Sequence, residues 1–314
     1  MEILITGGAG YIGSALVSKL VTQGHDISVI DNLSKGKIEL LSSNTIFYKG
    51  DLVDLDFVDK VFGTNKFDCI IHIAGYKAAG ESMSMPGKYS DNIIGLINLL
   101  KCAEKFNVKK FIFSSSAGVY GEPVYNPIDE KHPTNPINYY GFTKLENERI
   151  LSWFEKTKGI QVVNLRYFNV VGDAGLNYID PDPQNVIPLI LDTLKGKREK
   201  FSIFGDDYDT PDGTCIRDYI DVADLVDAHI ESISLDKSAT INLGTGKGVS
   251  VLELIRITEQ LSKKKLNYDI LGRRDGDPDK LVASSKLAKE LMGWESKVSI
   301  GESIKSMLKV YGLI

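Results

Sequence analysis

A glycine-rich segment close to the N-terminus constrains the fold of this chain more than any other feature. The segment Thr6-Gly7-Gly8-Ala9-Gly10-Tyr11-Ile12-Gly13 follows an apolar run from Ile3 and opens an apolar-periodic stretch that reaches Gln23. It satisfies both G-x-G-x-x-G and G-x-x-G-x-x-G. Between a strand and a helix, such glycines allow a tight turn and bring a pyrophosphate close to bare backbone at the helix N-terminus. The segment therefore predicts a dinucleotide-binding turn.

The first half of the chain alternates short apolar runs with longer helical patterns. After the first strand, strands are expected near 27–30, 45–48, 69–73, 111–114 and 162–166, and helices near 54–62, 88–106 and 138–157. This alternation predicts a Rossmann-like, doubly wound parallel sheet with helices on both faces. Beyond residue 168 the pattern loosens into aspartate-rich turns. We expect an NAD-binding Rossmann domain over 1–168, with a return near 214–245, and a smaller α+β substrate domain mainly over 169–314.

Composition excludes several classes of protein. The chain has 37 basic and 42 acidic residues, a net charge of −5, which argues against binding to nucleic acid or to an anionic membrane. No stretch approaches the roughly 20 apolar residues of a membrane helix, and the N-terminus lacks the basic region of a signal peptide. Three scattered cysteines and four histidines show no metal-ligand spacing, so no metal site is expected. We expect a cytoplasmic protein.

Asp31 indicates which dinucleotide the turn would bind. It ends the second expected strand, 18 residues after Gly13, close to the usual distance for an acid that binds the ribose hydroxyls of adenosine. A carboxylate repels a 2′-phosphate, which favours NAD over NADP, although Lys35 and Lys37 lie nearby. The segment Gly50-Asp51-Leu52 can be read either as an adenine contact or as a simple turn.

Tyr140 and Lys144 form a Tyr-x-x-x-Lys pattern on an expected helix, so the two side chains share one face. A nearby ammonium group, reinforced by an oxidised nicotinamide ring, would stabilise the phenolate that a tyrosine needs to act as a base. Tyr139 is five residues from Lys144 and would face elsewhere. Ser114, Ser115 and Ser116 end the fifth strand, at the sheet edge where open α/β sheets bind ligands.

With the glycine turn, this set resembles the extended short-chain dehydrogenase/reductase superfamily, whose Ser/Thr–Tyr–Lys set is matched by Ser116, Tyr140 and Lys144. Longer stretches resemble the family of UDP-glucose 4-epimerases and span most of the chain. They are TGGAGYIG, DNLS, AGYKAAGES, SSSAGVYG, LRYFNVVG, IFGDDYDTPDGTCIRDYIDV and RRDGDPD.

The resemblance implies two sets of binding residues. The cofactor set would comprise Gly7, Gly10, Tyr11, Ile12, Gly13, Asp31, Asn32, Asp51, Leu52, Ala74, Lys77, Asn92, Ser114, Tyr140, Lys144, Tyr167 and Phe168. The nucleotide-sugar set would comprise Ser116, Asn169, Asn185, Phe204, Arg217, Arg274 and Asp277. The residue types agree, because arginine suits diphosphate oxygens and aspartate accepts from ribose hydroxyls.

The implied reaction is a redox cycle without net redox change. The Tyr140 phenolate would take the proton of the sugar 4-hydroxyl while C4 passes hydride to NAD, and Ser116 would bind that oxygen. Lys144 would hold the nicotinamide ribose and depress the tyrosine pKa. The 4-keto sugar would then rotate and receive hydride on its opposite face. Strong anchoring of the nucleotide and weak contact with the hexose would suit that rotation.

Several alternatives stay open. A 4,6-dehydratase needs an acidic pair after the serine or threonine, where this chain has Ala117 and Gly118. UDP-N-acetylglucosamine, UDP-glucuronate or UDP-xylose would each be a possible epimerase substrate, and Leu281 lies near a position whose size limits the sugar 2-substituent in such enzymes. A non-catalytic NAD-sensing protein would have lost the tyrosine or the lysine, and both are present.

The helices expected at 88–106 and 138–157 carry apolar stripes. Their members are Ile93, Leu96, Ile97, Leu100, Ile150, Leu151 and Phe154. These stripes can face the core alone or can also form a four-helix contact between two copies, as in relatives; we favour a homodimer.

Overall fold

The structure, a computed structural model, describes residues 1–180, 185–274 and 277–314. The chain divides into two compact units. Unit 1 consists of Met1–Gly121, Thr134–Arg166 and Val226–Ile241, and unit 2 of Glu122–Pro133, Tyr167–Leu225 and Asn242–Ile314. The chain therefore passes between the two units at five points.

Unit 1 is built on a seven-stranded sheet with the strand order β10-β6-β5-β4-β1-β2-β3. The strands are β1 (Glu2–Thr6), β2 (Asp26–Asp31), β3 (Ile46–Lys49), β4 (Cys69–His72), β5 (Lys110–Ser116), β6 (Gln161–Tyr167) and β10 (Ala239–Leu243). The pairs β3–β2, β2–β1, β1–β4 and β4–β5 are parallel. The expected Rossmann-like doubly wound sheet is confirmed, and the strand order reverses direction between β1 and β4, where such folds bind ligands.

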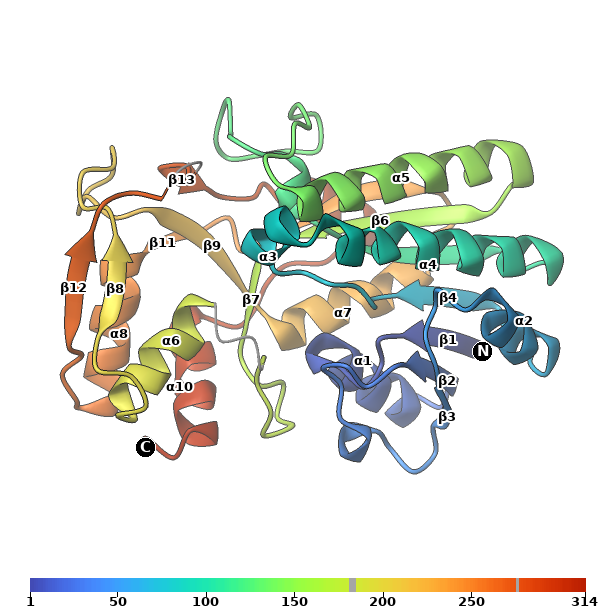
Figure 1. The fold of residues 1–314 in the computed structure, drawn as a ribbon, viewed down its shortest axis with the longest axis horizontal. Coiled ribbons are helices and arrows are strands. Elements are labelled where there is room, and N and C mark those ends of the chain that lie inside the picture. Colours follow the sequence, from blue (N-terminus) through green and yellow to red (C-terminus); the bar gives the residue numbers. More distant parts are fainter. Residues whose placement is uncertain (181–184, 275–276) are drawn as a thin grey trace. The chain divides into compact units, whose positions relative to one another are not determined.

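Helices cover both faces of this sheet. They are α1 (Tyr11–Thr22), α2 (Leu55–Gly63), α3 (Ala79–Ser84), α4 (Pro86–Lys105), α5 (Tyr139–Lys158) and α7 (Val222–Ile233), with the short 3₁₀ turns η1 (Ile38–Leu40) and η2 (Ala117–Val119). Figure 1 shows α4 and α5 side by side along one face, with α1 and α7 on the other. Because both faces are covered, Ile3, Leu4 and Ile5 of β1 are all fully buried.

The two long helices lie close to their expected positions. Helix α4 spans Pro86–Lys105, where 88–106 was expected, and α5 spans Tyr139–Lys158, where 138–157 was expected. Local signals fix the ends of α5. The side chain of Asn138 accepts a hydrogen bond from the Gly141 N–H at the start, and Gly159 takes a left-handed conformation at the end.

Unit 2 contains two smaller sheets. One is a four-stranded sheet with the order β11-β9-β13, in which β7 also pairs with β9, and the other pairs β12 with β8. The strands are β7 (Asn169–Val171), β8 (Phe201–Phe204), β9 (Ile216–Asp221), β11 (Gly248–Ser250), β12 (Tyr268–Leu271) and β13 (Lys280–Leu281), and the helices are α6 (Val186–Leu194), α8 (Val251–Ser262), α9 (Lys286–Met292) and α10 (Ile300–Val310). The core of unit 2 packs fully buried side chains of three helices together: Ile190, Leu254 and Ile304.

Among the helices in the described part of the chain, none has both the length and the apolar character required to cross a membrane.

Candidate active site

The glycine turn joins β1 to α1 in unit 1, as its sequence context requires. Gly7 has a φ of +73°, and a Cβ there would lie 2.7 Å from the backbone nitrogen of Ala74. A Cβ on Gly13 would lie 2.1 Å from the carbonyl oxygen of Gly7. Gly10 lies at the N-cap of α1 and supplies no side-chain cap to the first turn, which contains Tyr11 and Ile12. This bare helix N-terminus fits a pyrophosphate.

Asp31 lies at the end of β2 beside the turn. Its Oδ2 accepts a hydrogen bond from the Ala9 N–H at 3.1 Å, and its Oδ1 accepts one from the Leu33 N–H at 2.8 Å. Burial raises the pKa of this carboxyl group, and the two backbone donors oppose that rise. Each oxygen keeps a further acceptor position, which fits a ribose hydroxyl. The Asp31 carboxylate therefore stabilises the glycine turn through its bond with Ala9. It lies where a contact with the ribose is expected.

The loops after β3 and β4 carry the other expected cofactor residues of unit 1. Asn32 donates to the Asp51 carboxylate at 2.9 Å, and Leu52 follows in the same loop. After β4, the N–H of Ala74 donates to the Thr6 carbonyl at 3.0 Å, and Lys77 is exposed.

Asn92 lies on α4 and is almost completely buried. Its Oδ1 accepts from the Tyr76 N–H at 2.8 Å, and its Nδ2 donates to the Tyr76 carbonyl at 3.0 Å. The Asn92 amide therefore holds the loop that carries Ala74 and Lys77 through two hydrogen bonds to the Tyr76 backbone.

Ser116, Tyr140 and Lys144 come together at the end of β5 and the start of α5. The Ser116 hydroxyl is hydrogen-bonded to Tyr140. Lys144 is 5% exposed, its Nζ donates to the Ser114 carbonyl at 2.7 Å, and the same nitrogen lies 5.9 Å from the centre of the Tyr140 ring. The structure thus places a hydroxyl and an ammonium group beside one phenol.

Electrostatics at this set act in opposing directions. Burial raises the pKa of the Tyr140 phenol, and the hydrogen bond with Ser116 counteracts part of that rise. Burial also lowers the pKa of the Lys144 ammonium to about 8, while the Glu148 carboxylate acts to raise it. An additional positive charge close to Tyr140 would therefore favour the phenolate.

The absence of a side chain at Gly141 allows η2 to approach the first turn of α5. A Cβ on Gly141 would lie 2.4 Å from the Gly118 carbonyl oxygen, whereas a Cβ on Gly118 would find its nearest neighbour, the Ser116 Oγ, at 3.4 Å. This contact lies beside the Ser116–Tyr140 pair, since Ser116 Oγ, Gly141 and the Tyr140 ring all lie within 4 Å of a Cβ built on Gly118. Tyr139 points away from the set, because its hydroxyl is bonded to the Ser90 hydroxyl at 2.8 Å.

Four expected substrate residues gather in unit 2. The Asp277 carboxylate forms ion pairs with Nε of Arg274 at 3.0 Å and with Nη2 of Arg217 at 3.4 Å. The Arg274 guanidinium lies over the Phe204 ring at 4.5 Å from its centre. Two guanidinium groups around one carboxylate leave a net positive charge, which suits a diphosphate. The motif that contributes Arg274 also includes residues 275 and 276, which lie outside the described residues.

The other expected residues of unit 2 have separate contacts. Asn169 donates to the Asp218 carbonyl at 3.0 Å, and Asn185 donates to the Asp180 carboxylate at 2.7 Å. Tyr167 is the last residue of β6, and the buried Phe168 donates its N–H to the Leu243 carbonyl at 3.3 Å. Among the described residues, none of these contacts joins the cluster of Arg217, Arg274, Phe204 and Asp277.

Sequence reasoning missed three buried charged residues. Glu148 and Arg166 form an ion pair in unit 1. In unit 2, the carboxylate of Asp218, the neighbour of Arg217, accepts bonds from Thr245, Gly246 and Ala283. The sequence did contain a feature that could have identified Glu148, because it follows Lys144 by four residues on the same helix face.

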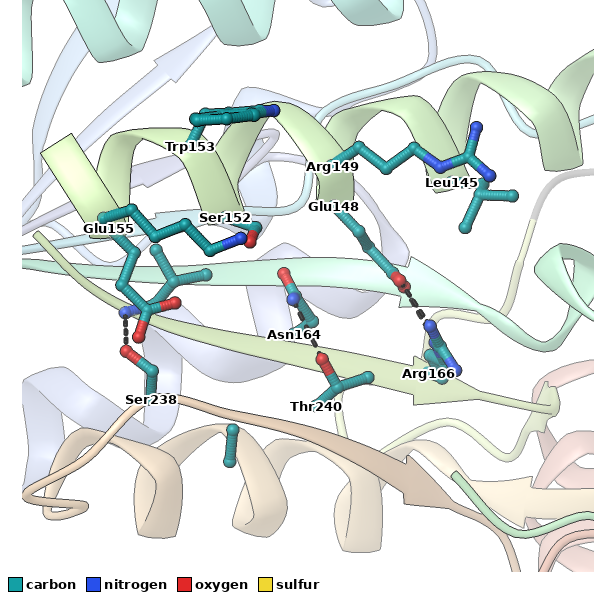
Figure 2. Close-up of a pocket in the computed structure, with 13 residues that line it drawn as sticks. Leu145, Glu148, Arg149, Ser152, Trp153, Glu155, Asn164, Arg166, Ser238 and Thr240 are labelled. Atoms are coloured by element: carbon teal, nitrogen blue, oxygen red, sulfur yellow. Dashed lines mark hydrogen bonds and ion pairs between the residues drawn. The ribbon is translucent and has the colours of Figure 1, made fainter. Parts of the chain in front are cut away.

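A pocket of about 490 Å³ lies between α5, β6 and residues 238–240. Figure 2 shows the side chains that line it. Glu148 and Arg166 line it, but Ser116, Tyr140 and Lys144 are not among its lining residues. The chemistry of the chain therefore points to the Ser116 end of β5 and not to this pocket.

Comparisons with known proteins agree with this geometry. The model of the family described as "NAD dependent epimerase/dehydratase family" matches residues 3–244. The chain is 46% identical over 305 residues to a UDP-glucose 4-epimerase of Halalkalibacterium halodurans, covering 95% of this chain and 91% of that protein.

Two solved structures are also similar. A UDP-glucose 4-epimerase of Bifidobacterium longum in complex with NAD⁺ and UDP aligns with a TM-score of 0.93 and 38% identity, over 99% of this chain and 98% of that one. A UDP-Glc/GlcNAc 4-epimerase of Campylobacter jejuni aligns with a TM-score of 0.88 and 37% identity, over 100% and 99% of the two chains.

Proposed function

Since the chain belongs to the NAD dependent epimerase/dehydratase family, we propose that it is an NAD-dependent UDP-glucose 4-epimerase that interconverts UDP-glucose and UDP-galactose. Near-full-length relatives with that activity in their names support the assignment. The observation in this chain that carries it is the buried Lys144 ammonium beside Tyr140, with Ser116 hydrogen-bonded to the same phenol.

We assign NAD to unit 1 and the nucleotide sugar to unit 2, which keeps the expected division near residue 168. The glycine turn and the N-terminus of α1 would hold the pyrophosphate of NAD, and Asp31 would bind the adenosine ribose. When bound, NAD supplies a hydride acceptor that later returns the hydride, and its oxidised ring adds positive charge.

Each catalytic residue has one role in this proposal. Tyr140, as phenolate, takes the proton from the sugar 4-hydroxyl and gives it back after the sugar has turned. Ser116 donates a hydrogen bond to the reacting oxygen. Lys144 holds its ammonium near the phenolate and so opposes the effect of burial on the Tyr140 pKa.

The arginine cluster of unit 2 would anchor the UDP moiety. Arg217 and Arg274 would bind the diphosphate through charge-assisted hydrogen bonds, while Asp277 and the amides of Asn169 and Asn185 would bind hydroxyl or carbonyl groups. Binding strength concentrated on the nucleotide leaves the hexose free to rotate.

Purified protein supplied with NAD tests the proposal directly. UDP-glucose should convert to UDP-galactose, and the reverse, as followed by NMR of the anomeric and H-4 signals. Folded protein that binds NAD but exchanges neither sugar would contradict the epimerase function and favour the NAD-sensing alternative.

Other UDP-sugars form a second candidate substrate class. Leu281 is paired with Arg217 in the register of β13 and β9, so it lies beside a proposed diphosphate ligand. The related enzyme of Campylobacter jejuni is named for both glucose and N-acetylglucosamine. Running UDP-N-acetylglucosamine, UDP-glucuronate and UDP-xylose in the same assay would rank the substrates.

We also propose a homodimer formed through α4 and α5. Leu96, Leu100 and Leu151 of the expected stripes are buried in the core of unit 1, so they are not available to a partner. Ile94, Phe142 and Trp153 on the same two helices are 44%, 40% and 65% exposed. Analytical ultracentrifugation should give twice the chain mass, and a Trp153→Glu variant should shift the species to a monomer.

A cytoplasmic location completes the proposal. Cys69, Cys102 and Cys215 are all free thiols, as is usual in a reducing compartment. Fractionation of cells that make the protein should recover it with cytoplasmic markers.

A further inference from the structure

A buried ion pair lies next to the proposed catalytic residues. Glu148 follows Lys144 by four residues on α5, so Tyr140, Lys144 and Glu148 occupy successive turns of one helix face. Figure 2 shows Glu148 joined to Arg166 of β6 at one end of the pocket. Arg166 donates to both carboxylate oxygens, from Nε at 2.9 Å and from Nη2 at 2.5 Å, and the two side chains are only 8% and 7% exposed.

The same carboxylate also reaches β5. The Ser115 hydroxyl donates a hydrogen bond to Oε1 of Glu148. Ser115 lies between Ser114, whose carbonyl receives the Lys144 ammonium, and Ser116, which is bonded to Tyr140. One carboxylate therefore connects the helix that carries Tyr140 and Lys144 to the strand that carries their partners.

Each serine hydroxyl at the end of β5 has its own hydrogen-bond partner. The Ser114 hydroxyl is bonded to Nε2 of His229 at 3.0 Å, and the Ser116 hydroxyl accepts the Gly118 N–H at 3.1 Å. The Ser115 hydroxyl is bonded to Glu148 of α5, the helix that also carries Tyr140 and Lys144. Because these three residues share one rigid helix, the Glu148–Ser115 bond adds a third link between that helix and the strand, beside Lys144–Ser114 and Tyr140–Ser116.

Stability alone is a poor reason for burying these charges. Taking an ion pair out of water is costly, and well-packed apolar side chains often hold two elements together equally well. An apolar side chain at position 148 could not accept the Ser115 hydrogen bond. The pair is therefore better explained by the geometry that it enforces.

We propose that Glu148, held by Arg166, is a positioning residue that fixes Ser115 and thereby the spacing between Lys144, the Ser114 carbonyl and Ser116. The inference rests on the proposed epimerase function. Removing the carboxylate should impair the chemical step and leave nucleotide-sugar binding largely unchanged, because neither residue belongs to the proposed UDP-binding set.

The charges around Lys144 give the positioning role a second signature. In the described part of the chain, the titratable groups placed beside Lys144 include His72 on β4 and Tyr140 and Glu148 on α5, and Glu148 is itself paired with Arg166. His72 stays neutral near pH 7, since burial lowers its pKa to about 3. Loss of the Glu148 charge would leave Arg166 unbalanced, and the Lys144 ammonium would lose its proton at a lower pH.

The test compares Glu148→Gln with Glu146→Gln, which removes a partly exposed carboxylate paired with Arg149 on the same helix. We expect Glu148→Gln to lower kcat at least about tenfold with KM for UDP-glucose changed less than about twofold, and to move the basic limb of the kcat–pH profile to lower pH. Glu146→Gln should match the wild-type enzyme. A Glu148→Met/Arg166→Met double variant removes both charges together and should melt cooperatively, yet keep the low kcat.

Each outcome decides whether Glu148 has a positioning role. Wild-type kcat and pH profile in folded Glu148→Gln, or in the folded double variant, would overturn the positioning role. Loss of the melting transition in both variants would also overturn it, since the pair would then serve folding as such. If wild-type and Glu146→Gln proteins bind NAD but fail to epimerise, the proposed function fails instead.

Discussion

In the proposed reaction Tyr140 must give up a proton near neutral pH, although burial raises its pKa. Replacing it by phenylalanine removes the proposed base and leaves the ring in place. Tyr140→Phe should bind NAD normally and lose at least about two orders of magnitude in kcat, the usual contribution of a positioned acid–base group. Tyr139→Phe is the matched control, and its activity should stay close to that of the wild type. Retained activity in Tyr140→Phe would mean that another group is the base.

His72 should make folding sensitive to acid. It is buried beside Lys144, and burial, assisted by the Lys144 charge, lowers its pKa from 6.5 to about 3. A base with a depressed pKa in the folded state stabilises the fold fully above pH 6.5 and loses that contribution as the pH falls toward 3. The loss amounts to at most about 5 kcal/mol, at 1.36 kcal/mol for each pKa unit.

Chemical denaturation at several pH values measures this effect. His72→Gln replaces the imidazole by an uncharged amide that can still bond to Thr6, and its free energy of unfolding should depend less on pH between 6.5 and 3 than that of the wild type. His25→Gln, at a partly exposed turn, is the control. Equal pH dependence in wild type and His72→Gln would rule out His72 as the source.

Single residues were predictable where chemistry repeats at a fixed spacing. The glycine turn and the Tyr140–Lys144 pair could be identified because each depends on neighbours within one or two turns of chain, and Asp31 because it follows Gly13 at a spacing usual for this fold. Glu148 and Asp218 show the limit of that reasoning. Their partners Arg166 and Thr245 lie 18 and 27 residues away, and only the fold brings them together.

At the scale of elements, the contact between η2 and α5 is the most sensitive to side-chain size. A methyl group on Gly141 would meet the Gly118 carbonyl at 2.4 Å, while one on Gly118 would meet only ordinary contacts. Gly141→Ala should therefore displace Ser116 from Tyr140 and lower kcat by about tenfold or more, despite the higher helix propensity of alanine.

Gly118→Ala is the matched control, and we expect kcat within about twofold of the wild type because its nearest contact, 3.4 Å, needs little adjustment. Similar losses in both variants would show that the chain relaxes around either methyl group, and that the close approach does not set the position of Ser116.

Helices and parallel strands of unit 1 could be located from their apolar periodicity and caps. Segment 122–133 could not be assigned in this way. It packs with unit 2 through bonds of Ile128 with Val282 and Ser284, more than 150 residues further along the chain. Such pairing leaves no local pattern, and neither does the parallel pairing of β8 with β12.

At the scale of the whole molecule, the two proposed ligands should be separable by mutation. Gly13→Val would crowd the Gly7 carbonyl and should abolish the rise in Tm produced by NAD, while UDP still stabilises the protein. Arg217→Ala should show the reverse pattern. Each bound ligand at 100 times its Kd stabilises the native state by about 2.7 kcal/mol, which thermal shift assays detect easily.

Variants that lose both responses, or neither, would contradict the assignment of NAD to unit 1 and of the nucleotide sugar to unit 2. The fold class followed from strand–helix alternation across half the chain. The segments that make up each unit depend on where the chain crosses from one unit to the other. The pattern of side chains does not encode these crossing points.

The late position of β10 in the chain has a consequence for biosynthesis. β6 ends at Tyr167, but its neighbour β10 begins only at Ala239, so a ribosome adds more than 70 residues of other structure before the sheet can be completed. During that interval β6 presents an unpaired edge, the kind of surface on which nascent chains aggregate. Slow translation over 168–238 would prolong that exposure, and chaperones that shield strand edges would act there first.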